Sequence, residues 1–353
     1  MHKDTIIANR MKRHRLLTPV DSEEDYLELL RQLQPVNPIF YTCPGDPPSL
    51  YPRAAFNDQL VTRKLKARQV LTKGRYLGGG VGYVLADELE LFANAFCKPL
   101  TGLSPEGQQI LDVIKGAGPL SAGLIKEETG FLSKEIMPVL HKLQRAFIVY
   151  EDQTDSDDER PWELFERVWP EVRIGAEHKL VAVKSIVSRF IKINVFLSLG
   201  QLKSWSRLPV RLLKEAIQEL TEEQRIETMS VEGLGKGYVR PADISLAPAA
   251  PTPSVLMMHK ADPIVRMHLD DLKKEFDGEV LQYLLIDGEF KGAAMGHMRI
   301  GPHDVDDVEL HMARNECTSR QDKILSVIAE NYSPPRSRIR RYCGQRLAAQ
   351  GDQ

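Results

Sequence analysis

Basic side chains gather between residues 63 and 75 of a chain that is slightly acidic as a whole. The 353 residues include 47 Lys and Arg against 49 Asp and Glu, so the formal net charge is −2. In a chain without a global positive charge, binding to nucleic acid must come from a local basic patch, because phosphates are neutralised by nearby cations. We expect a strip of phosphate-contacting side chains at Arg63, Lys64, Arg68, Lys73 and Arg75.

A second basic segment lies at residues 3–16, where cationic and apolar residues alternate. The spacing predicts a basic amphipathic helix. Its polar face is consistent either with phosphate contacts or with an ordinary solvated surface, and the sequence leaves both interpretations open. The basic residues are Lys3, Arg10, Lys12, Arg13, His14 and Arg15.

The remaining polar clusters match no familiar catalytic or metal site. Histidines and carboxylates are dense between residues 297 and 311, but their spacing fits neither a zinc site nor an EF-hand loop. The glycine-rich run at residues 78–82 lacks the ending of a phosphate-binding loop, so it predicts a β-hairpin instead. We therefore expect neither a metal nor a cofactor.

Helices and a short strand are predicted over residues 103–152. Ser104 is a suitable N-cap and Pro105 a suitable first helical residue, and apolar residues then recur at helical spacing. A second helix begins near Leu120, a third begins at Ser133, and residues 147–149 form an apolar run short enough for a strand. This is the order of a winged helix, a helix-turn-helix variant whose last helix can enter a DNA groove.

The same pattern returns 77 residues further along the chain. The offset preserves a small motif of Leu, Ser, Gly and Lys, and it needs no gap to align the apolar positions of the next helix. A shared register over polar and apolar positions together favours a duplicated module. The matching pairs are Leu120 and Leu197, Ser121 and Ser198, Gly123 and Gly200, Lys126 and Lys203, Ile136 and Leu213, Leu140 and Ile217, and Leu143 and Leu220.

These features predict a helix-rich α+β protein with several modules. Asp287-Gly288 marks a hairpin in the last of them, and residues 246–253 form a linker. The expected divisions are a diverged N-terminal winged helix with the basic strip at 1–100, a central winged helix at 101–175, a third winged helix at 176–246, a β-rich C-terminal subdomain at 254–332, and a basic mobile tail at 333–353.

Composition places the chain among ordinary globular proteins. Four widely spaced cysteines indicate a reducing compartment, and no apolar run is long enough for a membrane span. We therefore expect a cytoplasmic protein without a membrane partner. An acidic segment at residues 152–159 would repel phosphate, so we expect it to face away from DNA.

Several short motifs, taken in this order, carry a family resemblance. They are the helix leading into Leu33-Gln34-Pro35-Val36, the stretch from Leu71 to Gly79 with its partner Gly82-Tyr83-Val84-Leu85, the two matching modules, and the segment from Leu284 to Gly292. The sequence resembles the tandem winged-helix DNA glycosylases of the AlkZ/YcaQ type. That resemblance implies three winged helices and a β-rich part around a concave cleft for double-stranded DNA.

The resemblance also implies a catalytic pair, Gln-apolar-Gln or Gln-apolar-Asp, in which the second polar side chain helps to hold a water molecule. Gln34 matches the first position and is the candidate catalytic residue. Val36 occupies the second position and cannot hydrogen-bond a water. Asn37 is adjacent, but we expect its side chain to point elsewhere. This departure puts base excision in doubt.

Two functions therefore compete. One is a DNA-repair protein, either a glycosylase or a lesion binder with little catalysis. The alternative is a non-enzymatic winged-helix transcriptional regulator. Such regulators usually dimerise to contact repeated half-sites, whereas several modules in one chain favour a monomer that clamps one duplex.

Overall fold

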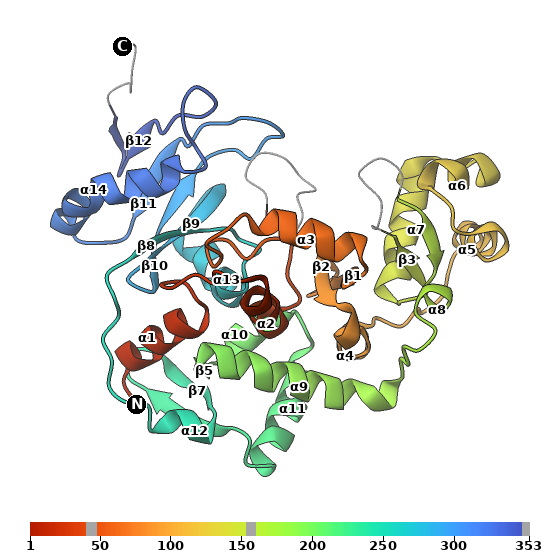
Figure 1. The fold of residues 1–353 in the computed structure, drawn as a ribbon, viewed down its shortest axis with the longest axis horizontal. Coiled ribbons are helices and arrows are strands. Elements are labelled where there is room, and N and C mark those ends of the chain that lie inside the picture. The colour runs from red at the N-terminus through yellow and green to blue at the C-terminus, as the bar shows by residue number, and fades with distance from the viewer. Residues whose placement is uncertain (40–47, 153–159, 348–353) are drawn as a thin grey trace.

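The N-terminal part contains four helices and a β-hairpin. The computed structural model describes residues 1–39, 48–152 and 160–347, so the acidic segment lies almost entirely outside the described residues. The elements are α1 (Lys3–Arg13), α2 (Glu23–Leu33), α3 (Asp58–Ala67), β1 (Leu71–Tyr76), β2 (Gly80–Leu85), the short 3₁₀ turn η1 (Ala86–Glu88) and α4 (Leu89–Phe96) (Figure 1).

The glycine-rich run forms the predicted hairpin. Strands β1 and β2 pair antiparallel, from Leu71 opposite Leu85 to Tyr76 opposite Gly80. Gly78 and Gly79 have φ values of 85° and 96°, which residues other than glycine rarely adopt. A Cβ at Gly79 would also lie 2.7 Å from Nε of Arg145 in the next module. The two glycines therefore allow both the turn and its close packing against Arg145.

The central segment has the predicted order of elements. It contains α5 (Pro105–Ala117), α6 (Ala122–Thr129), α7 (Ser133–Arg145), β3 (Val149–Glu151), β4 (Trp162–Leu164) and the short α8 (Phe165–Val168). The hydroxyl of Ser104 accepts a hydrogen bond from the Gly107 N–H, as expected for the N-cap of α5. The apolar faces of α5, α6 and α7 pack into a core that belongs to this segment alone.

The next segment repeats this arrangement at the predicted offset. It contains α9 (Ala176–Asn194), β5 (Phe196–Leu197), α10 (Leu199–Ser206), α11 (Val210–Glu222), β6 (Glu227–Val231), β7 (Gly235–Val239) and the short α12 (Pro241–Ile244). The limits of α10 and α11 are those of α6 and α7 moved by 77 residues. Ser121 and Ser198 both act as N-caps, and both Leu140 and Ile217 are buried. The predicted register of the repeat is confirmed.

One strand pairing occurs in all three segments. In each segment a residue that follows one helix (α2, α5 or α9) pairs antiparallel with the second strand of the later hairpin. The pairs are Val36 with Tyr83, Leu120 with Trp162, and strand β5 with strand β7. The N-terminal segment thus shares a connection with the other two segments, although no sequence repeat reveals it.

The C-terminal part is built on a four-stranded antiparallel sheet in the order β11-β10-β9-β8. Its elements are β8 (Val255–Met258), α13 (Pro263–Glu275), β9 (Val280–Ile286), β10 (Glu289–Met295), β11 (Asp307–Leu310) and α14 (Arg314–Ala329). Asp287-Gly288 forms the predicted turn between β9 and β10, with φ values of 54° and 80°.

The tail differs from the expected mobile segment as far as residue 347. Ile339 pairs with Val305, and the hairpin β12 (Arg341–Tyr342) and β13 (Gln345–Arg346) follows. The Tyr342 ring is buried and its hydroxyl donates to the Cys317 carbonyl at 2.7 Å. Apolar residues placed between the arginines therefore attach this stretch to the subdomain, and its last six residues lie outside the described range.

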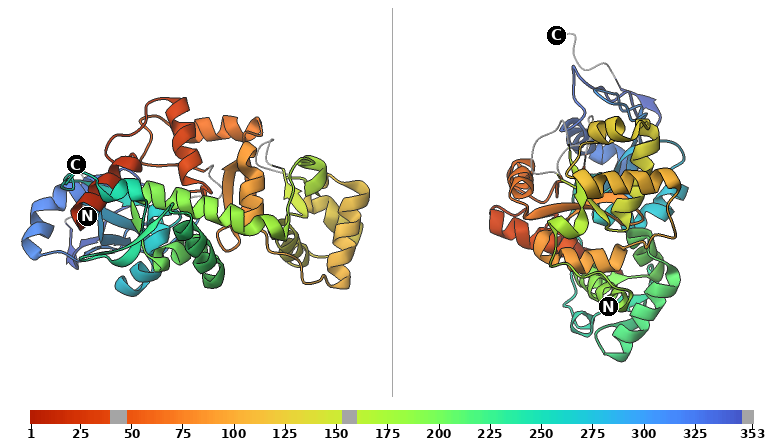
Figure 2. Two further views of the ribbon diagram at one scale, coloured as in Figure 1. Left: turned by 90° about the horizontal axis from the view of Figure 1, so that it is seen from below. Right: turned by 90° about the vertical axis from the view of Figure 1, so that its right-hand side faces the viewer.

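Helix α9 joins the parts of the molecule. It packs against α1, α2, α4 and α11, and Figure 2 shows it running along the long axis, with α5–α7 at one end and the C-terminal sheet at the other. One apolar core continues from the N-terminal part through α9 to α13. None of the described helices is both long enough and apolar enough to span a bilayer.

Candidate functional site

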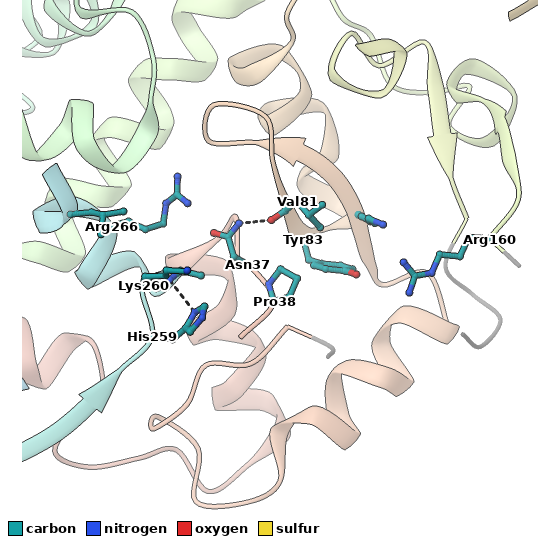
Figure 3. A pocket seen from close by; sticks show the side chains of 11 residues that line it. Asn37, Pro38, Val81, Tyr83, Arg160, His259, Lys260 and Arg266 are labelled. Atoms are coloured by element: carbon teal, nitrogen blue, oxygen red, sulfur yellow. Dashed lines mark hydrogen bonds between the residues drawn. The ribbon is translucent and has the colours of Figure 1, made fainter. Parts of the chain in front are cut away.

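A cavity of about 480 Å³ lies where the N-terminal hairpin, the C-terminal subdomain and the central segment meet (Figure 3). Lys73, Val81 and Tyr83 come from the hairpin β1–β2, and two residues come from the chain after α2. The opposite wall is formed by the turn after β8 and by helix α13. The complete described lining is Asn37, Pro38, Lys73, Val81, Tyr83, Arg160, His259, Lys260, Ala261, Arg266 and Leu269.

Asn37 lines this cavity and carries a buried acceptor without a partner among the described residues. Its Nδ2 atom donates to the Val81 carbonyl, which fixes the orientation of the amide (Figure 3). The Oδ1 atom is buried and has no hydrogen-bond partner among the described residues. A buried amide oxygen without a partner costs about 1–3 kcal/mol, so it favours a ligand or a water that donates a hydrogen bond.

The backbone explains why Asn37 faces the cavity. The Val36 N–H donates to the Tyr83 carbonyl at 2.9 Å, and the Tyr83 N–H donates back at 2.8 Å. Alternate side chains of an extended segment point to opposite sides. Val36 is therefore buried in the core, while Pro35 and Asn37 both approach Gly82 on the other side. Asn37 therefore points to the side opposite Val36, and that side lines the cavity.

Gln34 does not line the cavity. Its side chain is buried, its Oε1 atom accepts from the Leu85 N–H at 2.8 Å, and its Nε2 atom donates to the Glu88 carboxylate. Glu88 in turn receives Arg189, whose Nη2 atom lies 2.6 Å from Oε1 of Glu88. The amide of Gln34 thus joins the end of α2 to the end of β2 and the turn η1.

Four basic side chains surround the cavity. Lys73 forms a buried ion pair with Glu151 of β3, with 2.6 Å between Nζ and Oε2. Arg160 approaches the other oxygen of the same carboxylate at 3.6 Å. Burial lowers the pKa of Lys73 to about 8, although Glu151 acts in the opposite direction.

The other two basic side chains come from the C-terminal subdomain. Arg266 donates through Nη2 to the carbonyls of Leu77 and Trp205, and its buried Nε has no partner among the described residues. Burial lowers its pKa to about 10, so the guanidinium is still charged at neutral pH. Lys260 is exposed beside it. Burial, followed by the nearby Lys260, lowers the pKa of His259 to about 4, so this imidazole is neutral.

The predicted basic strip divides into two groups. Arg63, Lys64 and Arg68 are exposed on α3 or directly after it. Lys73 and Arg75 instead lie on β1 and face the central segment, where Nε of Arg75 donates to Oε1 of Gln144 at 2.9 Å. The structure therefore places three of the five side chains on a surface and two within an interface between segments.

The histidines and carboxylates near residue 300 form ion pairs instead of a common centre. His297 pairs with Glu279, and His311 lies between Glu275 and Glu309. Within the described ranges, no group of three or more His, Cys, Asp or Glu side chains is arranged to hold a metal ion.

Comparison with known proteins identifies the class to which this arrangement belongs. The profile of the family described as "DNA glycosylase AlkZ-like" matches residues 105–290, which is more than half of the chain. The chain therefore belongs to the AlkZ-like DNA glycosylase family. Among solved structures, the fold is similar to that of the DNA glycosylase AlkZ from Streptomyces sahachiroi.

That structural similarity covers 97% of this chain and 99% of the other, with a TM-score of 0.69 and 12% sequence identity. It therefore includes the N-terminal segment with Asn37, which precedes the residues matched by the family profile. No curated protein matches the chain.

Proposed function

We propose that this protein is a DNA-repair glycosylase that binds double-stranded DNA and cleaves the glycosidic bond of a nucleotide extruded into the cavity. The observation that carries the proposal is that Asn37 lines that cavity and has a buried Oδ1 atom without a partner among the described residues. Enzymes that act on a base within a duplex rotate the nucleotide out of the stack into such a pocket. Membership of the glycosylase family supports this assignment.

The chemistry requires a water molecule beside the sugar. The water oxygen bonds to C1′ while the bond from C1′ to the base nitrogen breaks, and the electron pair of that bond leaves with the base. The proton lost by the water passes to solvent or to the departing base, which leaves an abasic sugar. A neutral amide is too weak a base to take that proton, so we assign Asn37 the role of orienting the water through Oδ1.

Gln34 acts as a positioning residue in this proposal. Its two hydrogen bonds hold the end of α2 against β2, and Val36, which pairs with Tyr83, follows two residues later. Substitution of Gln34 would therefore affect excision through the placement of Asn37. Arg160, Lys260 and Arg266 would bind the phosphates on either side of the extruded nucleotide, because they are cations that line the cavity, whereas Lys73 is held in its buried ion pair with Glu151.

We also propose that the chain consists of three tandem winged-helix modules followed by the β-rich subdomain. The strand pairing shared by the three segments supports this division. In the first module, α3 occupies the position of the helix that enters a DNA groove. Its exposed Arg63 and Lys64, with Arg68 directly after it, would then contact the duplex backbone.

Single-turnover release of abasic sites tests the function. We expect the wild-type protein to release them from alkylated or crosslinked duplex. Ala261 lines the cavity and has a small side chain, so Ala261→Trp should fill the space that the nucleotide needs. This variant should lose about 10²-fold or more in rate and retain duplex affinity.

Excision that is indifferent to Ala261→Trp would show that the chemistry occurs elsewhere. Duplex binding by the wild type without any release of abasic sites would favour the non-enzymatic regulator. Circular dichroism and thermal unfolding should be the same for both proteins, so that a loss of rate is not a loss of fold.

A further inference from the structure

A second cavity of about 540 Å³ lies between the end of α1, the helix α2 and the end of α9. It shares no lining residue with the first cavity. Five of its described lining residues are basic, and only Asp25 and Glu28 are acidic. The basic ones are Lys12, Arg13, Arg15, Lys192 and Arg240.

A buried carboxylate holds two of these cations in place. Asp243 of α12 accepts from Nη1 and Nη2 of Arg13 at 3.0 and 2.6 Å, and from Nε and Nη2 of Arg240 at 2.9 Å each. The Asp243 side chain is only 2% exposed. Two guanidinium groups that share one carboxylate leave one positive charge in excess, and their planes are fixed before any ligand arrives.

The pKa of Asp243 agrees with this arrangement. Burial alone would raise it, but the hydrogen bonds from Arg13 and Arg240 outweigh burial and hold the pKa below its ordinary value. The carboxylate therefore remains ionised at neutral pH and continues to hold both arginines.

The other three cations are free to move toward a ligand. Lys12, Arg15 and Lys192 are exposed, and none of them forms an ion pair with a described residue. The acidic side chains do not cancel this charge: Glu28 is exposed and accepts from Nε2 of Gln32, and Asp25 is exposed in the first turn of α2. Arg13 also caps the end of α9 by donating to the Lys192 carbonyl.

We propose that this second cavity is a binding site for a phosphate group. The two arginines held by Asp243 supply one fixed excess positive charge at the cavity, and the mobile cations can donate to phosphate oxygens without demanding a fixed geometry. The phosphate could belong to the DNA backbone or to a free phosphorylated molecule, and the chemistry of recognition is the same for both. The site is separate from the excision cavity, so its test does not depend on base excision.

The test compares two triple variants of the full-length protein. Lys12→Ala, Arg15→Ala and Lys192→Ala remove the mobile cations. Lys274→Ala, Arg314→Ala and Lys323→Ala remove three exposed cations that line neither cavity, as a control of equal charge. Calorimetry measures the affinity for inorganic phosphate, and fluorescence anisotropy measures the dependence of duplex affinity on salt.

The first triple variant should lose about tenfold or more in phosphate affinity, and the control should not. Arg240→Ala, which removes one of the two arginines held by Asp243, should lose phosphate affinity as well. If the backbone of DNA occupies the site, the salt slope of the first variant should also fall below that of the control by about one unit. An unchanged slope would identify a free phosphorylated ligand. Equal salt slopes for the two triple variants, together with either of two results, overturn the proposal. The first result is that both variants bind phosphate like the wild type, and the second is that the wild type binds no phosphate.

Discussion

The side-chain amides of Gln34 and Asn37 have different surroundings. The family motif places Gln34 in the site, but its amide is saturated by Leu85 and Glu88. Asn37 lines the cavity, and its Oδ1 atom has no partner among the described residues. The decisive contact is the backbone pairing between Val36 and Tyr83, because it determines which side chains face the core. That pairing joins residues 47 positions apart, so no local pattern could have revealed it.

Replacement of Gln34 should affect stability before it affects chemistry. Gln34→Ala leaves the buried Leu85 N–H without its partner and removes a donor from Glu88. We expect a loss of about 1–3 kcal/mol in the free energy of unfolding, measured by urea denaturation. Gln32→Ala is the matched control, since Gln32 donates only to the exposed Glu28 and should change stability by about 0.5 kcal/mol or less. Equal stability of the two variants would contradict the structural role of Gln34.

For the basic strip, too, the order of residues in the sequence does not predict which side chains are exposed. Arg63, Lys64, Lys73 and Arg75 look alike in a count of charges. Lys73 and Arg75 nevertheless find Glu151 and Gln144, which lie in the next segment of the chain. Proximity in sequence identified the cluster, and the packing of the hairpin against the central segment separates the exposed cations of α3 from the two that lie in this interface.

Patterns formed by nearby residues predict whole helices best. Helix caps and apolar spacing predicted these helices because they depend on residues a few positions apart, and the 77-residue offset matched α6 and α7 to α10 and α11. The tail after residue 333 was expected to be mobile because of its arginines. Its attachment depends on Ile339 and Tyr342, whose partners Val305 and Cys317 lie 34 and 25 positions away.

The repeat predicts equivalent losses at equivalent core positions. Leu140 of α7 is fully buried, and Ile217 of α11 is 6% exposed. Leu140→Ala and Ile217→Ala should each lower the free energy of unfolding by about 2–5 kcal/mol, because each leaves a cavity beneath its helix. Urea denaturation measures both losses. A change of less than about 0.5 kcal/mol in either variant would mean that the two helices do not serve equivalent cores.

At the scale of the molecule, the candidate site is formed by parts that are distant in sequence. Asn37 and the hairpin belong to the N-terminal part, while His259, Lys260 and Arg266 come from residues more than 170 positions later. Local sequence patterns predict the helices and strands of each part, but the cavity forms only where the parts meet. The sequence therefore predicts the hairpin at this site. No sequence pattern indicates that the turn after β8 and helix α13 form the opposite wall of the cavity.

The exposed and the paired cations should differ in their effect on DNA binding. Arg63→Ala, Lys64→Ala and Arg68→Ala should each lower the slope of log K against log salt by about one unit, because each removes a proposed phosphate contact. Fluorescence anisotropy with a duplex at several salt concentrations measures this slope. Each single variant should be compared with Lys323→Ala, an exposed cation on α14. Slopes equal to that of this control would show that the face of α3 does not contact the duplex.

The central claim is that Asn37 orients the attacking water, and the rate of abasic-site release by Asn37→Ala tests it most directly. Under single-turnover conditions this variant should release abasic sites about 10²-fold more slowly than the wild type, with duplex affinity changed by about twofold or less. Asn315→Ala is the matched control, since Asn315 is exposed on α14, lines neither cavity and should leave the rate unchanged. An Asn37→Ala variant that is folded, binds duplex and excises at the wild-type rate would contradict the claim.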